Sequence, residues 1–298
     1  MRSVTKDNIT QAFLNYCGDD TDPRLKFILE KLVQHLHDFV RVTGLTHAEW
    51  RKGLELLYGA GEISTPERNE FILLSDVLGV SSLVDMVNSP EDGTPSSVLG
   101  PFHILGAPNV PVGIDLVGDN DGSVAVIGGR VLTPEGEPIA GADMEIWQTA
   151  DNGLYSNQDE AQPEYNLRAH MVSDKDGHYL FSTVRPAPYT VPDDGPVGEL
   201  LHATGRHPWR PSHLHFIITA KDYRPLFTEL FPSDDPYLDE DAVFGVRDQL
   251  VMEYRESDDV SSLPDDLAIK DNLKAPFYVV DFDFVLSRDT GSDQLLTS

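Results

Sequence analysis

The chain has 298 residues, 40% of them apolar, which is enough to bury one large core or a core with a smaller helical unit. Its 50 acidic and 22 basic residues give a formal net charge of -28, which repels phosphate backbones and anionic lipid headgroups. We therefore expect neither a nucleic-acid partner nor a membrane. The single cysteine, Cys17, cannot form an intrachain disulfide. Residues 1–13 contain no apolar stretch of signal-peptide length, and no run in the chain approaches the roughly 18 apolar residues of a membrane span. These features favour a cytoplasmic protein.

The first part of the chain has the apolar spacing of amphipathic helices. One stripe repeats at intervals of three and four residues and consists of Leu25, Ile28, Leu29, Leu32, Leu36, Phe39 and Val40. Thr46 and Glu49 fit a capping box at the start of a further helix. About four or five helices are expected before residue 88. After them the chain becomes rich in Gly, Pro, Asn and Asp up to about residue 122, which indicates a linker.

The second part of the chain has strand character. Apolar and β-branched runs separated by turn residues are expected to form strands at residues 123–131, 142–148, 178–183, 213–219 and 277–286. Short strands at this spacing predict an antiparallel sandwich or barrel. The expected fold class is therefore α+β, with a helical domain over residues 1–105 followed by an antiparallel β-sandwich domain over residues 106–298.

The expected strand at residues 213–219 contains two histidines at a spacing of two residues. In a strand, residues i and i+2 point to the same face, so His213 and His215 could bind one metal ion. The same spacing at His35 and His37 lies in a helical stripe, where it turns the two side chains apart. Taken alone, the strand pattern leaves open a pair of structural histidines, because imidazole is common in both settings.

A metal site at these histidines needs further ligands, and the sequence has no CxxC or HExxH motif to supply them. The alternative ligand is tyrosine, whose phenolate binds strongly Lewis-acidic ions such as iron(III). Tyr155 and Tyr189 both lie in turn-rich segments, from which a side chain can be aimed inward. Considered one at a time, each tyrosine is more simply explained by packing at a domain edge.

The order of these residues resembles the intradiol ring-cleavage dioxygenases. Tyr155 and Tyr189 are followed by the run from Gly205 to His215, which is typical of that family, and the resemblance covers nearly the whole chain. It includes the helical first part, which in this family looks like a dimerisation domain, and residues 98–108 at the start of the catalytic domain. Within the family, the segments most similar to hydroxyquinol 1,2-dioxygenases are residues 98–102, 163–168 and 206–211.

The resemblance implies an enzyme with one non-haem iron(III) ion per subunit. Its ligands would be Tyr155, Tyr189, His213 and His215, with Tyr189 as the tyrosinate that dissociates when substrate binds. The implied reaction is cleavage of an aromatic ring by O2 between two adjacent hydroxyls, in the degradation of aromatic compounds. With hydroxyquinol as the small aromatic substrate, the product would be maleylacetate.

Two further residues join Tyr189 as catalytic candidates by this resemblance. Arg210 matches the active-site arginine of the family, whose guanidinium could stabilise negative charge on the ring. Glu229 lies where the family has a glutamine that assists a later step, and a carboxylate only accepts hydrogen bonds unless it is protonated. Three interpretations stay open: the alignment of this segment is shifted, Glu229 is held neutral, or Glu229 pairs with Arg210.

The resemblance also indicates a substrate pocket, most of which is an apolar slot for a flat ring. The residues at the matching positions are Leu73, Asp76, Val98, Gly100, Pro101, Phe102, Val191, Pro192, Arg210 and Val243. Asp76 is a polar exception. Its carboxylate could accept a hydrogen bond from the third hydroxyl of hydroxyquinol, or it could be an ordinary aspartate on a helix surface.

Two other functions stay open at this point. A catechol or chlorocatechol 1,2-dioxygenase would use the same iron chemistry and yield cis,cis-muconates. More remotely, the sandwich could be a non-enzymatic binding module in which Tyr155 and Tyr189 only pack. For partners, the resemblance implies a homodimer through the N-terminal helices, and similar enzymes can hold a phospholipid in a tunnel between those helices.

Overall fold

The structure is a computed structural model that describes residues 3–18, 20–65, 68–265 and 267–289. The chain forms two compact units, Met1–Gly59 and Ala60–Ser298. This division lies earlier in the chain than the boundary expected after residue 105, because helices beyond Gly59 are hydrogen-bonded to the part that contains the sheets. None of the helices within the described ranges is long and apolar enough to cross a membrane.

The first unit contains α1 (Ile9–Leu14), α2 (Pro23–Thr43) and most of α3 (His47–Ile63). α2 begins where the Asp22 side chain accepts a hydrogen bond from the Leu25 amide at 2.8 Å, and it ends at Gly44, whose φ of 61° favours glycine. The capping box expected before α3 is confirmed by hydrogen bonds between Thr46 and Glu49 in both directions. No residue of α2 is buried, so its apolar stripe is exposed within this chain.

The helices of the second unit include α4 (Glu70–Val77), α5 (Val80–Asn88) and α6 (Pro196–Ala203). The Asn69 side chain caps α4 by accepting a hydrogen bond from the amide of Phe71 at 3.1 Å. Glu70 is fully buried, and its carboxylate accepts hydrogen bonds from Arg68 at 3.0 Å and from the Val197 amide at 3.1 Å. Glu70 therefore joins α4 to the first turn of α6, and apolar side chains of both helices pack in one cluster.

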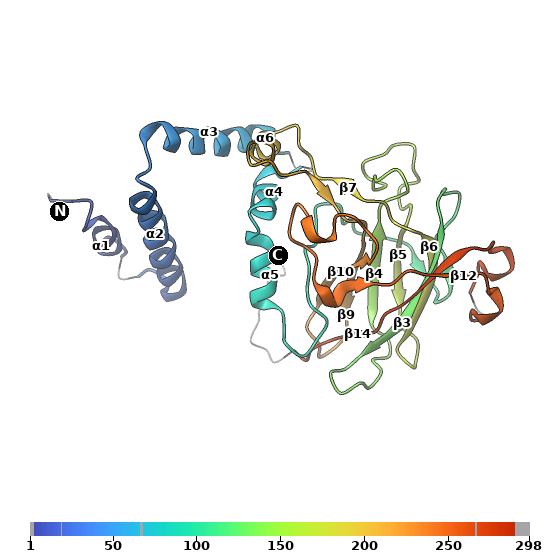
Figure 1. Cartoon of the computed structure of the whole chain (residues 1–298). Coiled ribbons are helices and arrows are strands. Elements are labelled where there is room, and N and C mark those ends of the chain that lie inside the picture. The colour runs from blue at the N-terminus through green and yellow to red at the C-terminus, as the bar shows by residue number, and fades with distance from the viewer. Residues whose placement is uncertain (1–2, 19, 66–67, 266, 290–298) are drawn as a thin grey trace. The chain divides into compact units, whose positions relative to one another are not determined.

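Two sheets form the sandwich of the second unit, which confirms the expected fold class (Figure 1). One sheet has the strand order β1-β5-β4-β9-β10-β11, and the other has the order β12-β13-β3-β6-β2 with β14 also paired to β3. A separate short pair joins β7 to β8. Most of the long pairs are antiparallel, as expected, but β13 joins β3 in parallel. Short strands such as β1 and β11 also join their neighbours in parallel.

The strands of the first sheet are β1 (Asn109–Val110), β4 (Asp143–Gln148), β5 (Arg168–Val172), β9 (Leu214–Thr219), β10 (Leu226–Pro232) and β11 (Val251–Met252). Those of the second sheet are β2 (Ile114–Asp115), β3 (Val124–Leu132), β6 (His178–Val184), β12 (Arg255–Ser257), β13 (Phe277–Asp281) and β14 (Phe284–Val285). The short pair is β7 (Tyr189–Thr190) and β8 (Trp209–Arg210). Single 3-10 turns are η1 (Leu238–Glu240), η2 (Asp248–Leu250), η3 (Val260–Ser262) and η4 (Lys270–Asn272).

The expected strands correspond to β3, β4, β6, β9 and, over residues 277–286, to β13 and β14 with a break between them. The sequence pattern does not predict β5 or β10. In β10, Pro232 at the end of the strand and Glu229 in its middle interrupt the apolar run, and both are buried by tertiary contacts. Burial that depends on distant residues is invisible in a local window.

The face of β9 that carries the histidine lies away from the core. Leu214 and Phe216 of β9 point into the cluster between the two sheets, so His215 points to the opposite face. The register places Trp147 of β4 and Glu229 of β10 directly beside His215. Because paired positions share a face, these three side chains form a row on the outer face of the first sheet. The candidate site is built on this row.

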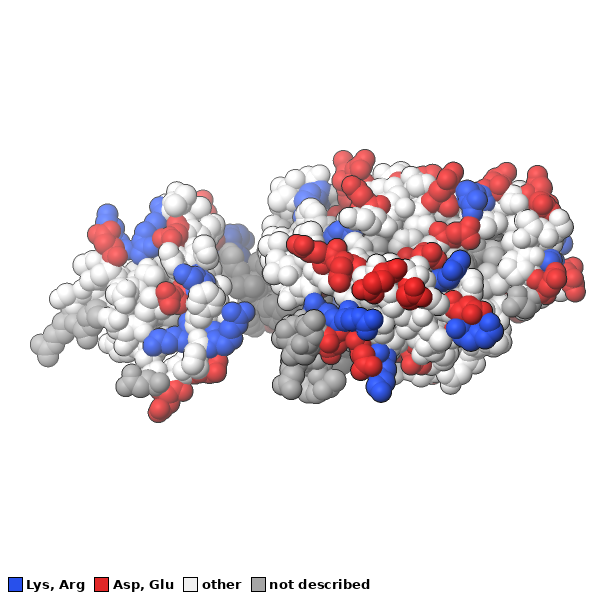
Figure 2. Space-filling view, turned by 90° about the horizontal axis from the view of Figure 1, so that it is seen from below, with Lys and Arg blue, Asp and Glu red and all other residues white. Residues whose placement is uncertain are grey.

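Figure 2 shows one face of the molecule coloured by charge. On the sheet-containing unit, acidic side chains occur in several groups across this face, with basic side chains between them. On this face of that unit, the acidic side chains are therefore spread across the surface rather than gathered in one short segment.

Candidate metal centre

The four candidate ligands converge on one buried point. The Nε2 atoms of His213 and His215 lie 3.1 Å apart, and the Tyr155 hydroxyl lies 3.2 Å from the first and 3.1 Å from the second. The Tyr189 ring packs against the rings of Tyr155 and His213, with centroids 5.6 and 5.5 Å apart. All four side chains are buried. Possible ligand atoms of Glu229 and the two histidines also lie within 4.8 Å of one another.

Segments on the outer face of the sheet deliver the two tyrosines. Tyr155 follows Gly153, which has a φ of 76°. A Cβ atom at Gly153 would lie 3.3 Å from the Pro188 carbonyl oxygen, so glycine allows this turn to approach Tyr189. Tyr189 lies on β7, whose register pairs it with Arg210 of β8. The short β7-β8 pair therefore brings one candidate ligand directly beside the candidate catalytic arginine.

The donor atoms suit a ferric ion. His213 Nδ1 lies 2.7 Å from the Pro211 carbonyl oxygen, which can only accept, so Nδ1 carries the proton and Nε2 offers a lone pair. Burial lowers the pKa of His213 and of His215, which keeps both imidazoles neutral. Burial raises the pKa of Tyr155 and of Tyr189, so their phenolates require a strongly charged cation nearby. Two neutral imidazoles and two phenolates fit one non-haem iron(III) ion.

Stacking contacts hold these donors in place. Phe102 stacks on Tyr155 with ring centroids 4.7 Å apart, and Trp147 stacks on His215 at 4.6 Å with 4° between the planes. Gly100 has a φ of 70°, and a Cβ atom there would lie 3.5 Å from His215 Cε1, so the chain can pass closely over this imidazole. Sequence reasoning missed Trp147. The available signal was its place in the expected strand at residues 142–148.

A cluster of buried charged side chains adjoins the four candidate metal ligands. Arg210 donates hydrogen bonds to both oxygens of Glu229, at 2.8 and 3.0 Å, and to both oxygens of Asp241, at 3.1 and 3.3 Å. Burial acts to lower the pKa of Arg210, but the negative charges of Asp241 and Glu229 together have the larger effect and hold this pKa well above its usual range. Burial acts to raise the pKa of Glu229, but the positive charge of Arg210 opposes this effect, and the pKa of Glu229 ends below its ordinary value. Of the three interpretations of Glu229, the geometry favours the ion pair with Arg210.

A cavity of about 290 Å³ opens beside Tyr189 and Arg210. Every residue expected to form the substrate pocket lines it: Leu73, Asp76, Val98, Gly100, Pro101, Phe102, Val191, Pro192, Arg210 and Val243. Sequence reasoning missed the lining residues that flank the family motifs, which are Arg68, Asn69, Glu70, Ile72, Asn157 and Gln158. Of the two tyrosines, Tyr189 lines this cavity and Tyr155 does not.

Asp76 places a carboxylate in the wall of this cavity. It lies on α4, is partly buried, and has a pKa that burial raises above its ordinary value, against the opposing effect of a hydrogen bond with Ser81. A fully solvated aspartate on a helix surface would show no such effect of burial. The position therefore favours contact with a bound molecule over the surface interpretation.

Comparison with known proteins agrees with this geometry. Residues 100–288 match a family model described as "Dioxygenase", and residues 22–94 match one described as "Catechol dioxygenase N terminus". A hydroxyquinol 1,2-dioxygenase of a Rhizobium species is 42% identical over 91% of this chain and 91% of its own length. A 6-chlorohydroxyquinol 1,2-dioxygenase of Cupriavidus pinatubonensis is 43% identical over 96% of this chain and 99% of its own length.

A solved structure extends the similarity to three dimensions. The hydroxyquinol 1,2-dioxygenase of Pseudomonas putida superposes with a TM-score of 0.88 at 43% identity, covering 95% of this chain and 99% of that chain. The 3-chlorocatechol 1,2-dioxygenase of Rhodococcus opacus superposes with a TM-score of 0.74 at 27% identity, covering 89% of this chain and 99% of that one. Sequence, fold and the arrangement of the site agree: the chain belongs to the intradiol ring-cleavage dioxygenase family.

Proposed function

We propose that this protein cleaves hydroxyquinol (1,2,4-trihydroxybenzene) with O2 between its adjacent hydroxyls, giving maleylacetate in the degradation of aromatic compounds. Both atoms of O2 enter the product, so the reaction needs no other reactant. The observation that carries the proposal is the convergence of four buried donors beside a cavity of ring size that has Asp76 in its wall. The relatives named hydroxyquinol 1,2-dioxygenase and 6-chlorohydroxyquinol 1,2-dioxygenase support the choice of substrate.

In this proposal, Tyr155, Tyr189, His213 and His215 hold one iron(III) ion per subunit. When bound, the ion supplies the Lewis acidity that makes a dihydroxylated ring reactive toward O2. Tyr189 lines the cavity, which supports a role for its phenolate oxygen in accepting one proton of the substrate diol. Tyr155 lies behind Phe102 and away from the cavity, which suits a ligand that stays in place.

Arg210 contacts the substrate ring and stabilises negative charge that develops on it, because its guanidinium is permanently charged and lines the cavity. Glu229 does not line the cavity, and its carboxylate instead accepts hydrogen bonds from Arg210 and from Ser97 Oγ at 2.7 Å. Its Oε1 also lies 3.5 Å from His215 Nδ1. Glu229 therefore acts on the reaction through Arg210 and His215, as an acceptor where the family has a glutamine.

The remaining pocket residues select a flat ring with three hydroxyls. Val98, Phe102, Val191 and Val243 supply apolar walls for the ring faces and edges. Asp76 accepts a hydrogen bond from the third hydroxyl, which catechol lacks. Hydroxyquinol is therefore bound better than catechol.

The direct test is oxygen consumption by the purified, iron-loaded protein with hydroxyquinol and catechol supplied separately, corrected for autoxidation of hydroxyquinol. We expect fast uptake with hydroxyquinol and maleylacetate as the product. If the protein instead prefers catechol or chlorocatechol and forms muconates, the proposed metal centre would stand, but the proposed role of Asp76 would be wrong. A preparation that is colourless, iron-free and cannot be loaded with ferric iron would sink the whole proposal, because ferric tyrosinate absorbs visible light.

A homodimer through the N-terminal helices is the proposed assembly, and exposed apolar side chains support it. They include Leu25, Phe27, Ile28, Leu32, Leu36, Phe39, Trp50 and Leu54, each about half exposed in the single chain. Light scattering that reports a monomer at working concentration would contradict the dimer. A phospholipid between these helices is tested by mass spectrometry of an organic extract of the dimer. The proposed location is the cytoplasm, as the single cysteine suits a reducing compartment.

A further inference from the structure

The segment 241–245 forms a turn between η1 and η2, beside the metal centre. Asp241 is buried at the start of this turn. Its carboxylate accepts hydrogen bonds from the Gly245 amide at 2.7 Å and from the Val243 amide at 3.2 Å. The side chain thus closes its own turn, and its two oxygens are fixed on a rigid backbone.

The same carboxylate holds one edge of the Arg210 guanidinium. Nε and Nη2 of Arg210 donate to Asp241 at 3.1 and 3.3 Å, while Nη1 and Nη2 donate to Glu229 at 2.8 and 3.0 Å. Two carboxylates on two edges leave this planar group a single orientation. Arg210 Nη1 lies 3.3 Å from His213 Nε2, so this orientation also decides where the positive charge lies relative to the four donors.

The turn shapes the substrate cavity as well. Val243 lines the cavity of about 290 Å³ together with Arg210. At Gly245 there is no room for a side chain, because a Cβ atom would lie 2.5 Å from Arg210 Nη2 and 2.9 Å from Glu229 Oε2. One short turn therefore sets both the orientation of the arginine and the position of an apolar wall.

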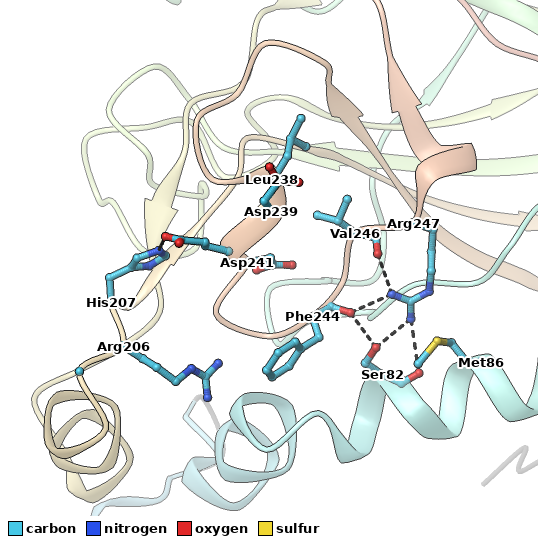
Figure 3. Close-up of a pocket in the computed structure, with 12 residues that line it drawn as sticks. Ser82, Met86, Arg206, His207, Leu238, Asp239, Asp241, Phe244, Val246 and Arg247 are labelled. Atoms are coloured by element: carbon cyan, nitrogen blue, oxygen red, sulfur yellow. Dashed lines mark hydrogen bonds and ion pairs between the residues drawn. The ribbon is translucent and has the colours of Figure 1, made fainter.

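On its other side the turn is anchored to α5 (Figure 3). Phe244 has a φ of 58°, which is unfavourable for a residue other than glycine. Its carbonyl oxygen accepts hydrogen bonds from Ser82 Oγ at 2.6 Å and from Arg247 Nη1 at 2.8 Å, and Arg247 Nη2 donates to Ser82 Oγ at 2.8 Å. Arg206 lies over the Phe244 ring, 4.9 Å from its centroid, and donates to the Ala242 carbonyl oxygen at 2.8 Å. These contacts hold the strained backbone in place.

We propose that Asp241 is the positioning residue of the site. Asp241 fixes the orientation of the Arg210 guanidinium beside the candidate metal ligands. The turn that it closes also sets the distance between this guanidinium and the cavity wall at Val243. This inference rests on the proposed function, because only there is Arg210 assigned to the substrate ring. Asp241 does not line the substrate cavity and acts through Arg210. Both of its oxygens accept hydrogen bonds, so an asparagine would turn an NH2 group toward other N–H donors.

The test compares Asp241→Asn with Asp239→Asn, both iron-loaded. Asp239 is exposed, so the control makes the same change of charge two residues away without touching Arg210. We expect Asp241→Asn to keep its iron and its visible absorption and to lose about 10- to 100-fold in kcat, because misplacing a catalytic group by about 1 Å has effects of this size. The KM should change less than kcat, by up to about threefold, since Val243 is one of several cavity walls and the other walls and the ligands remain. The control should match the parent.

Amide hydrogen exchange gives a second readout that does not depend on activity. At least one of the amides at residues 243 and 245 should exchange faster in Asp241→Asn than in the parent or in Asp239→Asn, because the two amides donate to different oxygens of Asp241 and asparagine keeps only one acceptor oxygen. If Asp241→Asn does not fold, Ser82→Ala takes its place. That variant removes one anchor of the turn from α5, and we expect a smaller fall in kcat with iron content unchanged.

The outcomes separate the inference from the function on which it rests. If the parent cleaves hydroxyquinol and Asp241→Asn has the same kcat and the same amide exchange as the parent, Asp241 has no positioning role, but the proposed function stands. Equal loss of iron and of activity would assign Asp241 to general stability and also overturn the inference. If the parent itself does not cleave hydroxyquinol, the proposed function fails, and the exchange of the two amides alone decides whether Asp241 holds the turn.

Discussion

Replacing Asp76 with alanine should reduce the preference of the enzyme for hydroxyquinol over catechol by about 10- to 30-fold. In the proposed pocket the third hydroxyl then loses its acceptor, and a hydrogen bond to a charged group contributes about 1.5 to 3 kcal/mol. Because Asp76 is only partly buried, the lower end of this range applies, and about 1.5 to 2 kcal/mol corresponds to a loss of about 10- to 30-fold in kcat/KM. Catechol has no third hydroxyl, so its kcat/KM should change by less than about threefold.

The assay is initial-rate oxygen uptake with each substrate on the parent, Asp76→Ala and Asp76→Asn, at matched iron content. Asp76→Asn is the matched control, since its amide keeps the shape of the side chain and one acceptor oxygen. We expect the ratio of the two kcat/KM values to fall in the order parent, Asp76→Asn, Asp76→Ala. An equal loss with both substrates would show that Asp76 supports the fold of the pocket rather than recognition of the third hydroxyl.

Three further predictions address catalysis, pH and packing. Arg210→Lys should keep the iron absorption and lower kcat by at least about 100-fold, because an ammonium cannot reproduce the forked contacts with two carboxylates; unchanged turnover would contradict this. Burial raises the pKa of Asp85 from 3.8 to about 6, so the folded state binds this proton more tightly, and the resulting stability is present at low pH and lost as pH rises through about 6. Asp85→Asn should therefore raise Tm by an amount that grows from about pH 4 to about pH 6 and levels off above about pH 7, whereas a gain independent of pH would point to another cause. Gly129→Ala should lower the free energy of unfolding by more than about 3 kcal/mol in a denaturant titration, because its Cβ atom would lie 1.8 Å from the Phe282 carbonyl oxygen.

Local patterns in the sequence predict the parts of the site that local geometry determines. The spacing of His213 and His215 predicts a shared face because alternation belongs to the strand itself, and the structure shows their Nε2 atoms 3.1 Å apart. Tyr155 and Tyr189 could be chosen from ten tyrosines only through the family resemblance, since no local rule separates a ligand from a packing residue. The structure brings both beside the histidines.

What the sequence does not predict depends on contacts between distant segments. Glu229 lies on β10, a strand without a clear pattern, and its partner Arg210 lies 19 residues earlier. Asp241 shows its role only through an arginine 31 residues away and a turn closed by its own side chain. Nothing in the stretch around Asp241 distinguishes it from the neighbouring Asp239 and Glu240 until burial separates them.

Because Trp147, His215 and Glu229 form a row across three strands, the proposed iron site can assemble only when these strands pair in the correct register. A slip of β9 by one residue would turn His215 into the core and bring Phe216 to the outer face, since successive side chains alternate. Such a misfolded chain would lose the His215 imidazole from the proposed iron site and its stacking contact with Trp147, even if all its helices had formed. If the proposed iron site is correct, the ratio of tyrosinate absorption to protein concentration in a refolding experiment would therefore report the fraction of correctly registered molecules. Added ferric iron should increase that fraction, because the four proposed ligands converge in that register.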